Sequence, residues 1–226
     1  DQNIDLRQAF VLTTMSWITI AFFGALPFYL SNINLGFTDS FFESMSGITT
    51  TGSTILISIE ASPPSILVWR SLLQWLGGIG VIVMAIAIFP MLSVGGMQLF
   101  KAENFENPEQ VVPRATSLTR GIFIIYSVLT LIWASLLYFS GMSSFDSILH
   151  SMTTIATGGY STKSGSIGAF NSQLIDWIII LGMIFGSLPF VHYLAMTKGS
   201  YRDLIKDSQV RWFLVLLTIL ILTIFS

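Results

Sequence analysis

Two polar stretches interrupt an otherwise strongly apolar chain, and the second repeats the first. Residues 38–54 read TDSFFESMSGITTTGST, and residues 144–162 read SFDSILHSMTTIATGGYST. Without a gap, the aligned identities are Asp39 with Asp146, Ser40 with Ser147, Ser44 with Ser151, Met45 with Met152, Ile48 with Ile155, Thr50 with Thr157 and Gly52 with Gly159. Each stretch lies between segments apolar enough to cross a bilayer, so the pattern predicts an internal structural repeat.

Each stretch predicts a short helix followed by extended backbone. In the first, the candidate N-caps are Thr38, Asp39 and Ser40, and the expected buried side is Phe41, Phe42 and Met45. The part that follows, residues 48–53, is rich in hydroxyl groups and contains a glycine. Backbone of this kind is tolerated at membrane depth only when it is buried in protein or lines a watery cavity.

Composition places the chain among integral membrane proteins. It is 53% hydrophobic and 10% charged, with a mean hydropathy of +0.75. A net charge of −2 gives no electrostatic reason to expect a nucleic-acid partner, and the absence of cysteine excludes disulfides and thiolate metal sites. No acid–base pair, nucleophile triad or phosphate loop stands out, so we do not expect an enzyme. The chain begins with Asp1, and we expect it to be a piece of a longer polypeptide.

Four full membrane spans are predicted, roughly over residues 10–30, 69–92, 121–139 and 174–196, with a fifth beginning at 211–225. The expected fold class is an all-α integral membrane protein, built from repeated helix–pore helix–filter–helix units around an ion path. The expected divisions are a first unit (1–96), a cytoplasmic connector (97–120), a second unit (121–197), and a connector with the start of a third unit (198–226).

The distribution of lysine and arginine predicts the orientation. Two bases, Arg70 and Lys163, fall on one side of this arrangement, and the others fall on the opposite side: Arg7, Lys101, Arg114, Arg120, Lys198, Arg202, Lys206 and Arg211. Positive charge is enriched in cytoplasmic loops. We therefore expect a cytoplasmic N-terminus, with both polar stretches entering the membrane from outside.

This arrangement suits a cation path. Main-chain carbonyl oxygens can replace the water shell of K⁺ without adding full charge. Glycine allows the backbone turns that point successive carbonyls to one side. The C-terminal ends of the short helices would direct partial negative charge toward the membrane centre.

Several other residues have two possible roles. Arg70 is either an interfacial side chain whose charge reaches the lipid headgroups or the partner of Asp39, Glu43 or Glu60 in an ion pair. His150, opposite Glu43 in the repeat, is expected to be structural, with a proton relay as the alternative, and His192 is expected to be interfacial. Tight helix packing rather than a gate is expected at Gly77-Gly78-x-Gly80 and Gly182-x-x-x-Gly186, and a kink or helix end rather than a hinge at Pro90 and Pro189.

Four motifs resemble the TrkH/KtrB family of potassium uptake proteins, and in particular its TrkH branch. They lie at residues 39–54, 69–103, 151–162 and 165–170. The resemblance implies four M1-P-M2 repeats around one K⁺ path, of which this chain carries two and the start of a third. It also implies a bacterial inner (plasma) membrane, contact with membrane lipid and with the remaining repeats, a homodimer, and cytosolic nucleotide-binding Trk regulatory subunits. K⁺ would be the transported ion, with no organic cofactor.

The resemblance also assigns the filter residues. In the first repeat they are Thr50, Thr51, Gly52 and Ser53. In the second, the ungapped match gives Thr157, Gly158, Gly159 and Tyr160, with Gly159 as the filter glycine. A one-residue slip gives Ala156, Thr157 and Gly158, with Gly158 as the filter glycine. Of these residues, Ala156, Thr157, Gly158 and Gly159 are assigned to the filter.

Two other classes of function remain open. A secondary transporter of another solute, coupled to Na⁺ or H⁺ and built on broken helices, would need ionisable residues buried in its spans. A membrane scaffold or enzyme subunit without a pore would be indicated by an exposed catalytic cluster. The predicted spans carry almost no ionisable residues, which favours the ion path.

Overall fold

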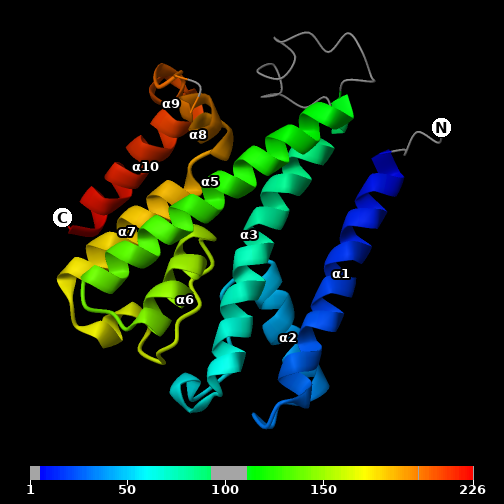
Figure 1. Ribbon diagram of the computed structural model, residues 1–226, viewed down its shortest axis with the longest axis vertical. Coiled ribbons are helices and arrows are strands. Elements are labelled where there is room, and N and C mark those ends of the chain that lie inside the picture. Colours follow the sequence, from blue (N-terminus) through cyan, green and yellow to red (C-terminus); the bar gives the residue numbers. More distant parts are fainter. Residues whose placement is uncertain (1–5, 93–110, 198, 226) are drawn as a thin grey trace.

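A computed structural model describes residues 6–92, 111–197 and 199–225, and this part of the chain is helical without β-strands. The first repeat contains α1 (Leu6–Leu30), α2 (Phe37–Ile48), the short turn η1 (Ile59–Ala61) and α3 (Pro64–Leu92). The second contains α5 (Val111–Phe139), α6 (Ser144–Ile155), η3 (Ser166–Phe170), α7 (Gln173–Ser187) and α8 (Phe190–Thr197). Two further helices follow, α9 (Arg202–Lys206) and α10 (Ser208–Phe225) (Figure 1).

The first three predicted spans are confirmed, and the fourth is broken. Helices long and apolar enough to cross a membrane cover Phe10–Leu30, Pro64–Met84 and Ser117–Phe139. The stretch predicted as one span at 174–196 consists instead of α7 and α8, which meet at an angle of 87°. Pro189 explains the break, because proline disfavours helical backbone in the residue before it, and Leu188 is extended with ψ 147°.

The predicted connectors are partly helical. Helix α5 begins at Val111, inside the segment 97–120 that was expected to be a loop. Pro113 does not prevent this, because proline is tolerated in the first turn of a helix. Helix α10 likewise begins at Ser208, and α9 precedes it within the second predicted connector. Lys101 and Lys198, used to predict the orientation, lie outside the described residues.

Helices α2 and α6 are too short to cross a membrane. Each has 12 residues and is therefore about 18 Å long, whereas the hydrocarbon core is about 30 Å thick. Both lie toward the same end of the bundle, opposite the start of α1 (Figure 1). This placement gives the two helices the form of re-entrant pore helices.

The predicted caps of α2 were wrong. Its N-cap is Gly36, and no side chain bonds to that end. In α6 the N-cap is Ser143, whose hydroxyl accepts a bond from the Asp146 N–H (3.0 Å) and donates one to the Asp146 carboxylate (2.8 Å).

The predicted buried side of α2 is confirmed only in part, because Phe41 and Met45 pack against an apolar cluster whereas Phe42 does not. The helix buries mainly polar or small residues: Ser40, Glu43, Ser44, Ser46, Gly47 and Ile48. Phe42 is 45% exposed, and Phe41 and Met45 are only partly buried. Lipid is as apolar as phenylalanine, so a membrane protein gains little by burying that face. Polar groups, in contrast, need partners inside the protein.

Glycines bring the long helices onto the ends of the short ones, as predicted. A Cβ added at Gly77 would collide with the carbonyl oxygen of Ile48, the last residue of α2. In the second repeat, a Cβ at Gly186 would lie 2.7 Å from the carbonyl oxygen of Ile155, the last residue of α6. The same backbone contact therefore recurs in both repeats.

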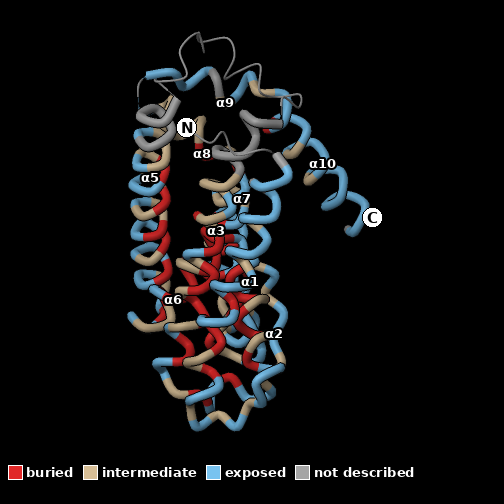
Figure 2. The backbone as a smooth tube through the Cα atoms, turned by 90° about the vertical axis from the view of Figure 1, so that its right-hand side faces the viewer, coloured by how far each residue is buried: buried red, intermediate tan, exposed pale blue. Residues whose placement is uncertain are grey.

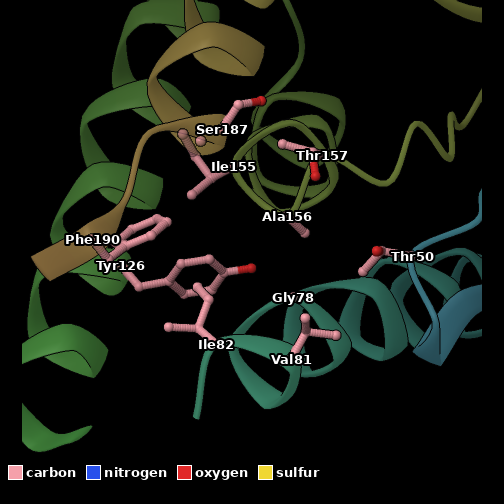
Figure 3. A pocket seen from close by; sticks show the side chains of 11 residues that line it. Thr50, Gly78, Val81, Ile82, Tyr126, Ile155, Ala156, Thr157, Ser187 and Phe190 are labelled. Carbon is pink, nitrogen blue, oxygen red and sulfur yellow. The ribbon is translucent and has the colours of Figure 1, made fainter. Parts of the chain in front are cut away.

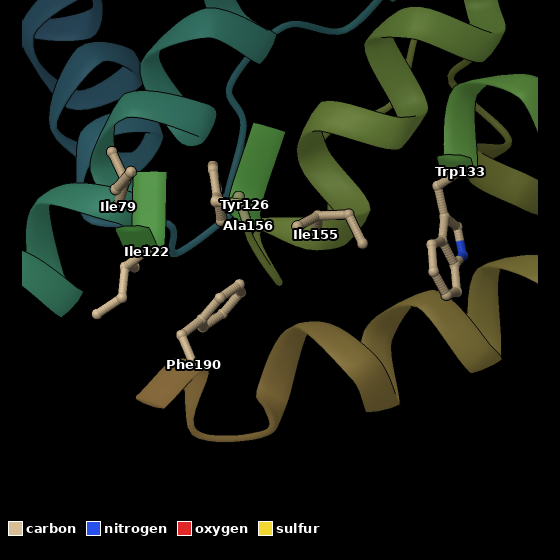
Figure 4. Packing of buried hydrophobic residues seen from close by; sticks show 7 residues of the cluster. All are labelled: Ile79, Ile122, Tyr126, Trp133, Ile155, Ala156 and Phe190. Atoms are coloured by element: carbon tan, nitrogen blue, oxygen red, sulfur yellow. The ribbon is translucent and has the colours of Figure 1, made fainter. Parts of the chain in front are cut away.

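Buried residues concentrate around α3 and the two short helices (Figure 2). An apolar cluster joins α3, α5, α6 and α8 (Figure 4); its members are Ile79, Ile122, Tyr126, Trp133, Ile155, Ala156 and Phe190. This cluster fixes the end of α6 against the helices of both repeats.

Candidate functional site: two converging filter segments

Both short helices end in the same hydrogen-bonded turn. In α2, the Thr50 N–H donates to the Gly47 carbonyl and the Thr51 N–H to the Ser46 carbonyl, each at 3.0 Å. In α6, Thr157 and Gly158 make the matching bonds to Thr154 and Thr153, at 3.0 and 2.8 Å. These are the two bonds of a Schellman motif.

Threonine occupies the left-handed position of each turn. Thr50 has φ 55° and Thr157 has φ 53°. For a β-branched residue this conformation is a true outlier, and it costs on the order of 1–3 kcal/mol. Strain of this kind clusters at functional sites, which makes these two turns candidates for a function.

Two residues beyond each threonine, a glycine again has positive φ: 79° at Gly52 and 83° at Gly159. The two segments therefore share their backbone pattern in the ungapped register. Of the two glycines weighed for the second repeat, Gly159 is the one with the conformation of Gly52.

The candidate filter segments, residues 50–53 and 156–159, converge. A Cβ added at Gly52 would collide with the carbonyl oxygen of Gly158, so the backbones touch. A Cβ added at Gly159 would meet no heavy atom of the described residues within 4 Å. The second segment thus rests on the first at Gly158 and faces open space at Gly159.

Gln74 of α3 holds the second segment, and our sequence reasoning missed it. Its side-chain Nε2 donates to the Gly158 carbonyl at 2.9 Å, and its Oε1 accepts from the Tyr160 N–H at 3.1 Å. The residue is fully buried. A glutamine inside an apolar span was the available signal, because polar residues at membrane depth need a specific partner.

Glu43 and Arg70 form a buried ion pair, confirming one of the two interpretations of Arg70 and ruling out the interfacial one. Arg70 Nε lies 2.8 Å from Glu43 Oε1, and the side chains are 1% and 0% exposed. The carboxylate also accepts from the Thr54 hydroxyl (2.8 Å) and the Ile55 N–H (3.1 Å). Glu43 thereby anchors the chain just beyond the first filter segment.

The same pair reaches the second repeat. Arg70 Nη1 donates to the Ser161 carbonyl at 3.1 Å, and the guanidinium lies 4.0 Å from the centre of the Tyr160 ring. The Tyr160 hydroxyl donates to the Glu43 carbonyl at 2.9 Å. One buried network therefore links the segments that follow both short helices.

His150 repeats the role of Glu43, as its position predicts. Its Nε2 lies 3.0 Å from the hydroxyl of Ser161, the residue that matches Thr54 in the repeat. Its Nδ1 lies 2.8 Å from the Asp146 carbonyl. With both ring nitrogens engaged, His150 is a structural residue.

A cavity of about 350 Å³ adjoins both helix ends (Figure 3). It is lined by Thr50, Gly78, Val81, Ile82, Tyr126, Ile155, Ala156, Thr157, Gly186, Ser187 and Phe190. Because Thr50 and Thr157 lie two residues beyond the ends of α2 and α6, the partial negative charge of both helix C-termini is directed to this region. Among the described residues, no cluster of His, Asp and Glu is able to hold a metal ion.

Paired re-entrant helices with converging polar segments define a pore-type membrane protein. A family model, TrkH, described as a cation transport protein, matches residues 1–226. The chain belongs to the TrkH family.

Relatives agree in sequence and structure. The chain is 45% identical over 218 residues to the Trk system potassium uptake protein TrkI of Halomonas elongata, covering 96% of this chain and 44% of that protein. It is 41% identical over 213 residues to TrkH of Escherichia coli K12, covering 92% and 44%. The crystal structure of the potassium transporter TrkH from Vibrio parahaemolyticus matches with a TM-score of 0.86 at 34% identity, over 99% of this chain and 46% of that one. The chain thus spans less than half the length of these relatives.

Proposed function

We propose that the protein containing this chain carries K⁺ across the bacterial plasma membrane through a filter of main-chain carbonyls. The observation that carries the proposal is the contact between two segments with the same backbone conformation, where Gly52 touches the Gly158 carbonyl. Relatives named potassium uptake proteins support K⁺ as the ion. Neutral carbonyl ligands suit K⁺ because they replace its water without trapping it.

The proposed filter residues are Thr50, Thr51, Gly52, Ser53, Ala156, Thr157, Gly158 and Gly159. Within this set, the positive φ of Gly159 supports it as the counterpart of Gly52. Two segments cannot surround an ion, so the remaining ligands would come from repeats beyond this chain. The division into units at 1–96 and 121–197 belongs to the same proposal.

The buried ionisable groups give little support to a coupled secondary transporter. Glu43 and Arg70 neutralise each other and bond to the chain around the filter segments. These structural bonds account for both charges, and no transported proton is needed to explain them.

The remaining assignments are proposed from the family and from charge. We place the N-terminus in the cytoplasm, by the positive-inside bias. We also propose that the full protein is a homodimer that binds cytosolic nucleotide-binding Trk regulatory subunits at the end formed by α8 and α9.

Serine substitutions in the full-length protein, reconstituted in liposomes, test the proposal. Gly52→Ser and Gly159→Ser should each lower the K⁺/Na⁺ flux ratio, because a side chain is strained at their positive φ and the neighbouring carbonyls must shift. A loss of about 1.4 kcal/mol in the preference for K⁺ over Na⁺ would lower the ratio about tenfold. Gly168→Ser is the control, since an added Cβ there meets no described atom within 4 Å and its φ is not positive. An unchanged flux ratio in Gly52→Ser would refute the filter assignment.

A further inference from the structure

We propose that Gln74 is a positioning residue that sets the geometry of the second filter segment and, through it, ion selectivity. This inference rests on the proposed K⁺ function. The carboxamide acts like a neighbouring β-strand: it donates to one carbonyl and accepts from the N–H two residues later. Both bonds are buried, and a buried polar group left without a partner is strongly unfavourable, so the carboxamide holds the second segment in place.

The glutamine also determines which carbonyl is available to an ion. Its Nε2 donates a hydrogen bond to the Gly158 carbonyl oxygen, and a Cβ added at Gly158 would collide with the Gln74 carboxamide. The Gly158 carbonyl is therefore turned toward α3. Gly159, which faces open space, is left to line the path.

The two hydrogen bonds of Gln74, which we call the Gln74 brace, connect different repeats. Gln74 belongs to α3 of the first repeat, whereas Gly158 and Tyr160 follow α6 of the second. Gly77 and Gly186 make the same contact in the two repeats, so they can be aligned. Gln74 lies three residues before Gly77, and the residue three positions before Gly186 is Met183. Methionine cannot form this pair of bonds, and Met183 is 47% exposed on this chain. The filter segments are therefore not all held in the same way. The second segment, which Gln74 holds by two hydrogen bonds, should be more rigid than a segment that has methionine at the matching position.

The decisive variant is Gln74→Met in the full-length protein. It preserves side-chain length, removes both bonds, and introduces the residue found at the matching position. We expect the K⁺/Na⁺ flux ratio to fall about tenfold in liposomes, because the second segment is released.

Thr130→Val is the matched control. Thr130 is buried and accepts from Trp75 Nε1 at 3.0 Å, so this near-isosteric change also removes a bond between α3 and α5, but one in which no residue of the filter segments takes part. Its flux ratio should remain that of the wild type. A loss of selectivity equal to that of Gln74→Met would show a general effect of destabilisation and overturn the proposal.

A second measurement does not depend on transport. Hydrogen–deuterium exchange at the Tyr160 amide should be faster in Gln74→Met than in the wild type and unchanged in Thr130→Val. Unchanged protection in Gln74→Met would refute the brace even if the protein carries K⁺. Absent K⁺ flux in the wild type would instead refute the proposed function, while this exchange still tests the brace. If Gln74→Met does not reach the membrane, Gln74→Glu serves instead: it keeps an acceptor for the Tyr160 N–H but loses the donor to the Gly158 carbonyl, so it should also lower selectivity. No loss of selectivity would overturn the proposal.

Discussion

Single residues stabilise this site through polar bonds buried inside the protein. The carboxylate of Glu43 accepts bonds from Arg70, Thr54 and Ile55, and it is fully buried. Removing two charges from water costs several kcal/mol per ion, and the cost is recovered only where geometry and extra hydrogen bonds are good. Because these bonds end on the chain beside the filter segments, the charges are used to position backbone.

A charge-removal series tests this interpretation. Arg70→Met should destabilise the full-length protein by roughly 3–5 kcal/mol, because it leaves a carboxylate buried without a counter-ion. Adding Glu43→Gln should recover part of the loss, since glutamine removes the charge and keeps one acceptor oxygen, enough for either the Thr54 hydroxyl or the Ile55 N–H. Thermal denaturation in detergent measures both. A double variant no more stable than Arg70→Met would show that the unpaired charge is not the cause.

At the scale of whole helices, close approach at glycine sets the position of the short helices. Gly77 lets α3 touch the last carbonyl of α2, and Gly186 lets α7 touch the last carbonyl of α6. The filter segments begin within two residues of these contacts. A displaced long helix would therefore move a filter segment directly.

Two alanine substitutions on one helix separate packing from helix propensity. Gly77→Ala should destabilise the protein by about 1–3 kcal/mol, the usual cost of overpacking, because the new methyl group collides with the Ile48 carbonyl. Gly80→Ala should be neutral or stabilising by up to about 1 kcal/mol, from propensity alone, since its Cβ would lie 3.5 Å from Trp17, an ordinary contact. Thermal unfolding compares them. Equal effects would contradict the assigned contact.

Across the whole molecule, a second link joins the repeats beyond the filter segments. Glu60 of η1 accepts from the Ser164 N–H at 2.7 Å and from its hydroxyl, and the Ile59 N–H donates to the same hydroxyl at 3.3 Å. Bonds from the Ser164 hydroxyl and N–H hold the pKa of Glu60 below its usual value of 4.5. The folded state thus favours the ionised carboxylate.

This link predicts a pH dependence. With the folded pKa lowered, the stabilisation is fully present above about pH 4.5 and is lost as pH falls through the folded pKa. The wild type should therefore have a higher Tm than Glu60→Gln at neutral pH, and the difference should shrink below pH 4.5. Asp146 is present in both proteins, so its titration largely cancels. A Tm difference that does not vary with pH would contradict the role of the charge.

Local pattern determined much of this protein. Span length, the repeat and the Pro189 break all follow from properties of neighbouring residues: the length of an apolar run, the chemistry of a turn, and the restriction that proline places on the residue before it. The ungapped match already paired Thr50 with Thr157 and Gly52 with Gly159, and their backbone angles agree.

Tertiary structure decided what surrounds these elements. From the sequence alone, Arg70 was expected either to reach the lipid headgroups or to pair with one of three acidic residues, because charge does not say which partner is near. In the folded chain its Nε lies 2.8 Å from Glu43 Oε1. Folding also buried polar residues of α2, such as Ser40 and Glu43, more completely than the expected Phe41, Phe42 and Met45, because polar groups need partners inside the protein whereas lipid accepts apolar side chains. It also brought Gln74 to a segment 84 positions away in sequence, a contact that no local periodicity encodes.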